Sequence, residues 1–107
     1  MNVNDILRRK SNQIFSIPPT ASVYDALTLM SEKNLGGVLV MNGDQLAGIF
    51  TERDYARKII LLGRSSKDTP ITEVMTSSVR TISRDTEIDD CMKMMTEKTI
   101  RHLPVVE

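Results

Sequence analysis

An internal repeat with an offset of 65 residues limits this chain to folds built from two related units. Residues 16–23 align with residues 81–88, and the alignment continues without a gap as far as residues 41 and 106. Each copy has apolar residues at positions i, i+3, i+4 and i+7, the pattern of an amphipathic helix. These positions are Val23, Ala26, Leu27 and Met30 in the first copy and Ile88, Cys91, Met92 and Met95 in the second.

The first copy is long enough to predict every element of one unit. Capping residues, a continuously apolar run and glycine-containing turns divide it into short segments. In order, these are an entry strand near residue 17, a helix of about 12 residues from Ser22 to near Asn34, a strand at 38–41, a turn at Asn42-Gly43, a strand at 46–51 and a helix that Gly63 closes. The predicted class is α/β (α+β), each unit being a small mixed sheet with two helices.

Polar residues 64–70 separate the two copies and predict a linker. A short lead-in helix is expected ahead of each copy, at 3–7 and at 71–75. We therefore place the first unit, with its lead-in helix and linker, at residues 1–68 and the second unit at 69–107.

The second copy reaches only its first hairpin strand before Glu107. We therefore expect a second unit that is truncated at its C-terminus. Residues 103–106 would then form an exposed apolar sheet edge, and such an edge pairs readily with another chain. A homodimer that covers this edge is the alternative to a truncated chain.

The composition excludes several function classes. Fourteen basic against fourteen acidic residues give zero net charge, so the broad basic surface of a nucleic-acid-binding protein is missing. No apolar stretch approaches the 18 residues that a membrane span needs, and a single cysteine can form no internal disulfide. We expect a cytoplasmic domain with neither a membrane nor a nucleic acid as its primary partner.

The residue types that often carry catalysis have simpler interpretations in this sequence. Cys91 lies on the apolar helix pattern, which predicts a small core residue rather than a nucleophile. His102 is the only histidine, and no Cys, Asp or Glu lies at metal-ligand spacing from it. Asp89 and Asp90 complement the dipole of a helix N-terminus. We expect no metal site, no catalytic residues and no enzymatic activity.

Two segments resemble the signatures of a known family, the CBS domains. Residues 46–54, Leu-Ala-Gly-Ile-Phe-Thr-Glu-Arg-Asp, are similar to its glycine–apolar–apolar–Ser/Thr–x–x–Asp motif, and residues 101–106 resemble its strand that ends in Pro-Val-Val. The resemblance covers nearly the whole chain, and residues 51–58 and 63–67 resemble stand-alone bacterial and plant-mitochondrial CBS-pair proteins. It implies tandem CBS units, a Bateman module, with a regulatory rather than catalytic role.

The resemblance also implies a ligand and partners. CBS pairs bind adenosine compounds in clefts between their units, so AMP, ADP, ATP or S-adenosylmethionine is expected, with NADH as a further candidate and no obligatory cofactor. Two pairs commonly form a homodimer. The regulated protein is not named by the sequence, although similar plant proteins that act on thioredoxins raise a redox partner.

The chemistry of Thr51 and Asp54 allows two roles, which remain open at this point. A helix N-terminus attracts phosphate, a threonine hydroxyl can donate to it, and an aspartate can accept from two ribose hydroxyls. The same Thr-x-x-Asp spacing is close to a capping box, which needs no ligand. The chain is thus either a nucleotide sensor or a ligand-independent dimerisation scaffold.

The resemblance implies further ligand-binding residues around this pair. Ile49 and Ile82 would flank the adenine, Gly48 would allow its close approach, and backbone groups near Leu103 would read its edge. Thr81, Arg101, His102 and Pro104 would complete the site from the second unit. Weaker candidates, which equally fit a solvated helix face and linker, are the basic residues Arg53, Arg57, Lys58, Arg64 and Lys67.

A pseudo-symmetric second site would need another Thr-x-x-Asp after Glu107, and this sequence has none. We therefore expect that site to be incomplete. Its remaining half would consist of Ile17, Pro18 and residues 35–38.

Overall fold

The computed structural model describes residues 1–7, 15–98 and 102–106. The chain divides into two compact units. The repeat-1 unit is Phe15–Ser78, and the repeat-2 unit combines Met1–Ile14 with Val79–Glu107. No helix in the described ranges is long and apolar enough to cross a membrane.

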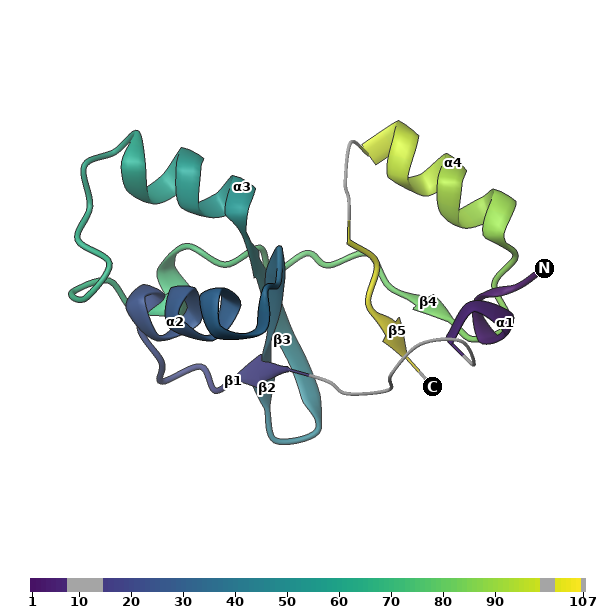
Figure 1. Cartoon of the computed structure of the whole chain (residues 1–107), viewed down its shortest axis with the longest axis horizontal. Coiled ribbons are helices and arrows are strands. Elements are labelled where there is room, and N and C mark those ends of the chain that lie inside the picture. Colours follow the sequence, from purple (N-terminus) through teal and green to yellow (C-terminus); the bar gives the residue numbers. More distant parts are fainter. Residues whose placement is uncertain (8–14, 99–101, 107) are drawn as a thin grey trace. The chain divides into compact units, whose positions relative to one another are not determined.

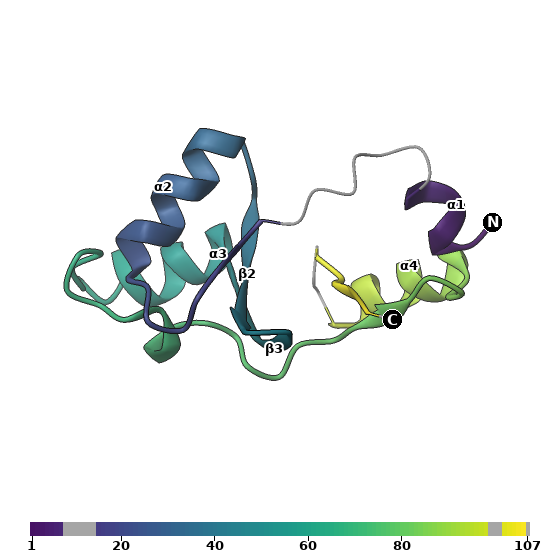
Figure 2. The ribbon, with the colours of Figure 1, turned by 90° about the horizontal axis from the view of Figure 1, so that it is seen from below.

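The repeat-1 unit is built on a three-stranded sheet in the order β1-β2-β3. The short strand β1 (Ser16–Ile17) runs parallel to β2 (Gly37–Asn42), and β2 runs antiparallel to β3 (Gln45–Thr51). Helix α2 (Val23–Lys33) and the helix that begins as α3 (Glu52–Asp54) lie on the same side of this sheet (Figures 1 and 2). The core between the layers is aliphatic apart from Phe50, and its fully buried side chains include Val23, Val40 and Ile59.

Helix α2 (Val23–Lys33) begins and ends where the sequence predicted. Ser22 accepts from the Asp25 backbone N–H, and the Asp25 carboxylate accepts from the Ser22 N–H, which makes a capping box. At the other end Asn34 adopts a left-handed conformation with φ 55°. Val23, Ala26 and Met30 are buried, so this stripe of the repeat faces the core as predicted.

The hairpin between β2 and β3 is also confirmed: β2 extends one residue beyond its predicted range at each end, and β3 extends one residue at its start. Asn42 pairs with Gln45, which leaves Gly43 and Asp44 as the two-residue loop. Gly43 has φ +61°, a conformation that glycine adopts without strain. The turn therefore depends on this glycine.

The second helix is less regular than the sequence predicted. It starts as α3 (Glu52–Asp54) and continues as a π-helix, η1 (Tyr55–Ile60), in which the Leu61 N–H donates to the Ala56 carbonyl. One side of this helix packs against the core: Ile59 is buried, whereas the three residues that follow it are exposed. Those exposed residues are Ile60, Leu61 and Leu62. Gly63, with φ +65°, follows the helix as predicted.

The repeat-2 unit contains a two-stranded parallel sheet of β4 (Ile82–Ser83) and β5 (Val105–Val106), with helices α1 (Val3–Leu7) and α4 (Ile88–Lys98) (Figure 1). Its core is formed by Val3, Ile82 and Cys91. In the described part of the chain β5 pairs with β4 alone, and Val106 is 40% exposed. Met92 lies on the predicted apolar stripe of α4, but its side chain is 61% exposed, so this position of the stripe does not face the core.

Each lead-in segment belongs to the unit of the other repeat. The Val3 N–H donates to the Thr86 carbonyl at 2.9 Å, and Val3 is buried with Ile82. The short 3-10 helix η2 (Ile71–Glu73) lies in the repeat-1 unit, where Ile71 is fully buried and donates to the Ala21 carbonyl. The compact units therefore differ from the sequence ranges 1–68 and 69–107, since burial decides where an apolar lead-in residue packs.

Candidate functional site

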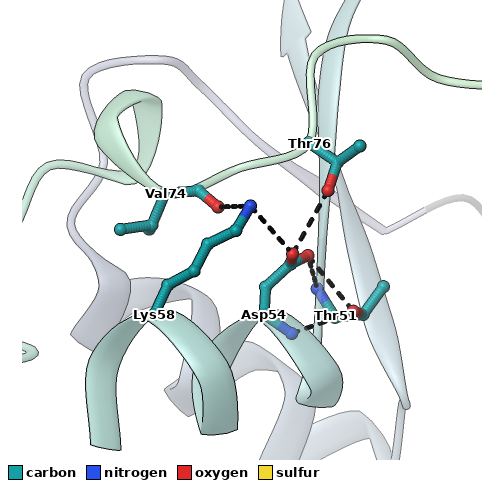
Figure 3. Close-up of polar contacts among 5 residues, drawn as sticks. All are labelled: Thr51, Asp54, Lys58, Val74 and Thr76. Carbon is teal, nitrogen blue, oxygen red and sulfur yellow. Dashed lines mark hydrogen bonds and ion pairs between the residues drawn. The ribbon is translucent and has the colours of Figure 1, made fainter. Parts of the chain in front are cut away.

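Thr51 and Asp54 form a capping box where β3 turns into α3 (Figure 3). The Thr51 hydroxyl oxygen accepts from the Asp54 N–H at 3.3 Å, and the Asp54 Oδ2 accepts from the Thr51 N–H at 3.0 Å. The Thr51 hydroxyl also donates to Oδ2 at 3.1 Å. The capping role that the sequence left open is therefore present.

The second oxygen of Asp54 also has partners within the chain. Oδ1 lies 3.1 Å from the Lys58 ammonium nitrogen and accepts from the Thr76 hydroxyl at 3.2 Å. Asp54 is only 7% exposed, and a buried carboxylate is stable only when its charge is paired and hydrogen-bonded. The four donors supplied by Thr51, Lys58 and Thr76 meet that requirement.

Lys58 links the helix to the segment that follows η2. Its ammonium group donates to the Val74 carbonyl at 2.9 Å as well as pairing with Asp54. Figure 3 shows this side chain reaching from the helix toward Val74, with the Thr76 hydroxyl directed at the same carboxylate. The site thus joins β3, the helix N-terminus and residues 74–76.

The close approach predicted at Gly48 is made by this chain itself. A Cβ atom on Gly48 would lie 2.7 Å from the Met75 sulfur and 2.9 Å from the Thr76 carbonyl oxygen. The neighbouring Ile49, which is half-buried, exchanges backbone hydrogen bonds with Thr76 at 3.0 and 2.8 Å. Residues 75 and 76 therefore cover the strand at this point.

The weaker basic candidates lie on the surface of the repeat-1 unit. Arg64 forms an ion pair with Glu73 at 2.6 Å, and the Lys67 ammonium lies 5.0 Å from the centre of the Tyr24 ring. Arg53 is exposed. For Arg64 and Lys67 the structure thus shows local contacts that need no phosphate.

The remaining predicted ligand residues belong to the repeat-2 unit. Ile82 is 8% exposed and forms part of that unit's core, and its N–H donates to the Pro104 carbonyl at 3.0 Å. Thr81 and His102 are exposed, and Leu103 and Pro104 are half-buried. Arg101 lies outside the described residues. Their binding role stays a prediction from the resemblance.

The half of the pseudo-symmetric site that the sequence retains lies within the repeat-1 unit. Ile17 and Val38 are buried in its core, whereas Pro18 is exposed. Residues 35–37, which lead from helix α2 into the first residue of strand β2, are half-buried. The apolar members of this half therefore have a packing role without a ligand.

Sequence reasoning did not assign Lys58 and Thr76 to the network around Asp54. Lys58 follows Asp54 by four residues, the spacing of neighbours on a helix face, so its pairing had a local signal. Thr76 lies 22 residues from Asp54, and no spacing rule connects them. Only the fold brings this hydroxyl to the carboxylate.

Cys91 is buried in the repeat-2 core, as predicted for a small packing residue. Burial raises the pKa of its thiol, and the negative charge of Asp90 raises it further. A thiol that resists ionisation is a poor nucleophile. Among the described residues, no group of three or more His, Cys, Asp or Glu side chains could hold a metal ion.

Comparison with known proteins places these features in a family. A CBS domain model matches residues 3–61 and 71–107. The chain is 45% identical over 91 residues to the mitochondrial CBS domain-containing protein CBSX3 of Arabidopsis thaliana, covering 80% of this chain and 44% of that protein. Across this and two further curated relatives, it spans 44% to 58% of their length.

Solved structures agree with the family match. The structure of a protein with CBS domains from Burkholderia ambifaria has a TM-score of 0.96 and 46% identity, covering 100% of this chain and 81% of that chain. A hexameric CBS-CP12 protein from bloom-forming cyanobacteria has a TM-score of 0.87 and 25% identity, covering 100% of this chain and 62% of that chain. The tandem α/β architecture predicted from the repeat is therefore confirmed.

Proposed function

This chain belongs to the CBS domain family, and on that premise we propose that it is a regulatory module that binds an adenosine compound where β3 meets α3. Its relatives are CBS-pair proteins of a generally regulatory kind. The observation that carries the proposal is the Thr51–Asp54 pair, a hydroxyl and a carboxylate held together at a helix N-terminus.

The residues of this pair match the chemistry of a nucleotide. The helix N-terminus carries partial positive charge and attracts a phosphate, to which the Thr51 hydroxyl can donate. The Asp54 carboxylate can accept from ribose hydroxyls, each charge-assisted bond contributing about 1.5–3 kcal/mol. AMP, ADP, ATP, S-adenosylmethionine and NADH all contain the required ribose and are the candidate ligands.

A second function, a ligand-independent scaffold, is favoured by a different observation. Both Asp54 oxygens already have donors from this chain, so the motif stabilises the fold without a ligand. The function would then lie in self-association or in binding another protein. The cyanobacterial neighbour is a CBS protein that assembles into hexamers.

Calorimetric titration of the whole chain with each candidate ligand separates these functions. Asp54→Asn is the informative variant, and Asp25→Asn is its matched control because Asp25 completes the corresponding capping box of α2. Under the sensor proposal Asp54→Asn loses at least about tenfold in affinity, the loss of one charge-assisted hydrogen bond. Asp25→Asn keeps wild-type affinity.

The scaffold function predicts a different result. No compound gives saturable heat at millimolar concentration with the wild-type chain or with either variant. Light scattering then measures self-association directly, and a monomer at high concentration would contradict the homodimer.

A further inference from the structure

We propose that Asp54, Lys58 and Thr76 form a latch that a bound ligand must open, so that ligand binding releases the segment leading from the repeat-1 unit to the repeat-2 unit. We call these three residues the Asp54 latch. The inference rests on the proposed function, because it assigns a regulatory consequence to a ligand at the same carboxylate.

The first argument is the capacity of the carboxylate. Two carboxylate oxygens offer about four lone-pair sites. In this structure four donors occupy them: the Thr51 N–H and hydroxyl on Oδ2, and the Lys58 ammonium and Thr76 hydroxyl on Oδ1. Two ribose hydroxyls can therefore bind only if existing donors leave.

The second argument identifies which donors can leave. The Thr51 N–H belongs to the helix cap and is fixed by the backbone of the β3–α3 junction. The Thr51 hydroxyl can turn from Oδ2 toward the ligand phosphate, which frees one site, so the second ribose hydroxyl still needs a site on Oδ1. The Lys58 and Thr76 donors at Oδ1 are side-chain groups that can rotate away. A ligand thus competes with the Oδ1 contacts while the cap remains intact.

The third argument is the position of Thr76 in the chain. Thr76 lies two residues before Ser78, the last residue of the repeat-1 unit, and pairs with Ile49 of β3. Lys58 holds the same segment through the Val74 carbonyl. Opening the latch therefore loosens residues 74–76 where the chain passes to the repeat-2 unit.

These contacts supply the differential affinity that regulation requires. A ligand that uses Oδ1 binds the open latch better than the closed latch, so it shifts the population toward the open state. Linkage is reciprocal, and a change that opens the latch must strengthen ligand binding.

The test uses the whole chain with Thr76→Val, which removes one hydroxyl and preserves the shape of the side chain. Thr72→Val is the matched control, because Thr72 is exposed in the neighbouring helix η2. Amide hydrogen exchange at Ile49 and Thr76, measured by NMR, reports on the latch. Calorimetry with AMP, ADP, ATP, S-adenosylmethionine and NADH reports on the ligand.

We expect Thr76→Val to raise exchange at both amides by about tenfold without ligand, and Thr72→Val to leave it unchanged. A saturating ligand should raise the same two rates in the wild-type chain. Thr76→Val should bind that ligand more tightly, by up to about tenfold.

If the ligand-free exchange rates of the amides at positions 49 and 76 are equal in Thr76→Val and Thr72→Val, the latch itself is overturned. Unchanged exchange on ligand saturation, or no gain in affinity for Thr76→Val, would overturn the competition. If neither the wild-type chain nor Thr76→Val binds any compound, the proposed function fails and the competition with it. The ligand-free exchange rates still decide separately whether the latch exists.

Discussion

The Lys58 ammonium nitrogen lies 3.1 Å from Oδ1 of Asp54, one helical turn earlier in the chain. The same nitrogen donates to the Val74 carbonyl, 16 residues further on. One side chain therefore neutralises a buried carboxylate and fastens a distant segment to the helix. The network around Asp54 is thus tertiary structure built on a local capping motif.

Replacing Lys58 by Met should lower the free energy of unfolding by about 1–2 kcal/mol. That value lies between an exposed ion pair, worth about 0–1 kcal/mol, and the rupture of a fully buried pair, about 3–5 kcal/mol. The intermediate value follows because the Lys58 side chain is 40% exposed whereas Asp54 is buried. Urea denaturation measures the loss, with exposed Arg57→Met as control. Equal stability of the two variants would show that the pair contributes nothing.

Replacing Gly48 by Ala should destabilise the repeat-1 unit by about 1–3 kcal/mol, the usual range for overpacking. The Met75 side chain can move away from the new Cβ, but the Thr76 carbonyl belongs to the backbone paired with Ile49. Hydrogen exchange at Ile49 should therefore accelerate. Gly43→Ala is the control. A Cβ atom at Gly43 would have no atom within 4 Å, so its strain comes only from the φ of +61°. Slow exchange at Ile49 in Gly48→Ala would contradict the predicted displacement.

The raised pKa of Cys91 should make the chain less stable at alkaline pH. In the unfolded state the thiol ionises near its ordinary pKa of about 8.5, whereas burial and the charge of Asp90 raise its pKa in the folded state. The unfolded state then binds fewer protons, so this stabilisation is present below about pH 8.5 and is lost as pH rises through the folded pKa. Urea denaturation from pH 7 to 10 should show a decline for the wild-type chain that Cys91→Ala lacks. If the stability of the wild-type chain and of Cys91→Ala declines equally with pH, the decline does not come from Cys91.

Each lead-in segment packs in the unit of the other repeat, and this arrangement predicts which unit a core mutation destabilises. Val3→Ala should destabilise the repeat-2 unit by about 1–3 kcal/mol, because Val3 is buried with Ile82 and Cys91. Hydrogen exchange should then accelerate in α4 but not in α2. Ile71→Ala, at a fully buried position of the repeat-1 core, should show the reverse pattern. Faster exchange in α2 for Val3→Ala would contradict the assignment of α1 to the repeat-2 unit.

Local features of the fold were readable from the sequence because neighbouring residues make them. Ser22 caps the helix that starts at Val23, Asn34 ends it, and Gly43 occupies the hairpin turn. The same locality made the Thr51–Asp54 spacing visible as a capping box. The π-helix after Asp54 had no such local signal; within it Ile59 packs into the core and Lys58 donates to the distant Val74 carbonyl.

The sequence alone thus determined the repeat, the class of fold, the family resemblance and the Thr-x-x-Asp motif, since each is a pattern of near neighbours along the chain. The tertiary structure decided that Ile71 and Val3 pack into the units of the opposite repeats, and that Met92 is exposed. It also brought Thr76 to Asp54 across 22 residues. These outcomes depend on which surfaces exclude water and which donors reach a buried charge, and no local spacing specifies either.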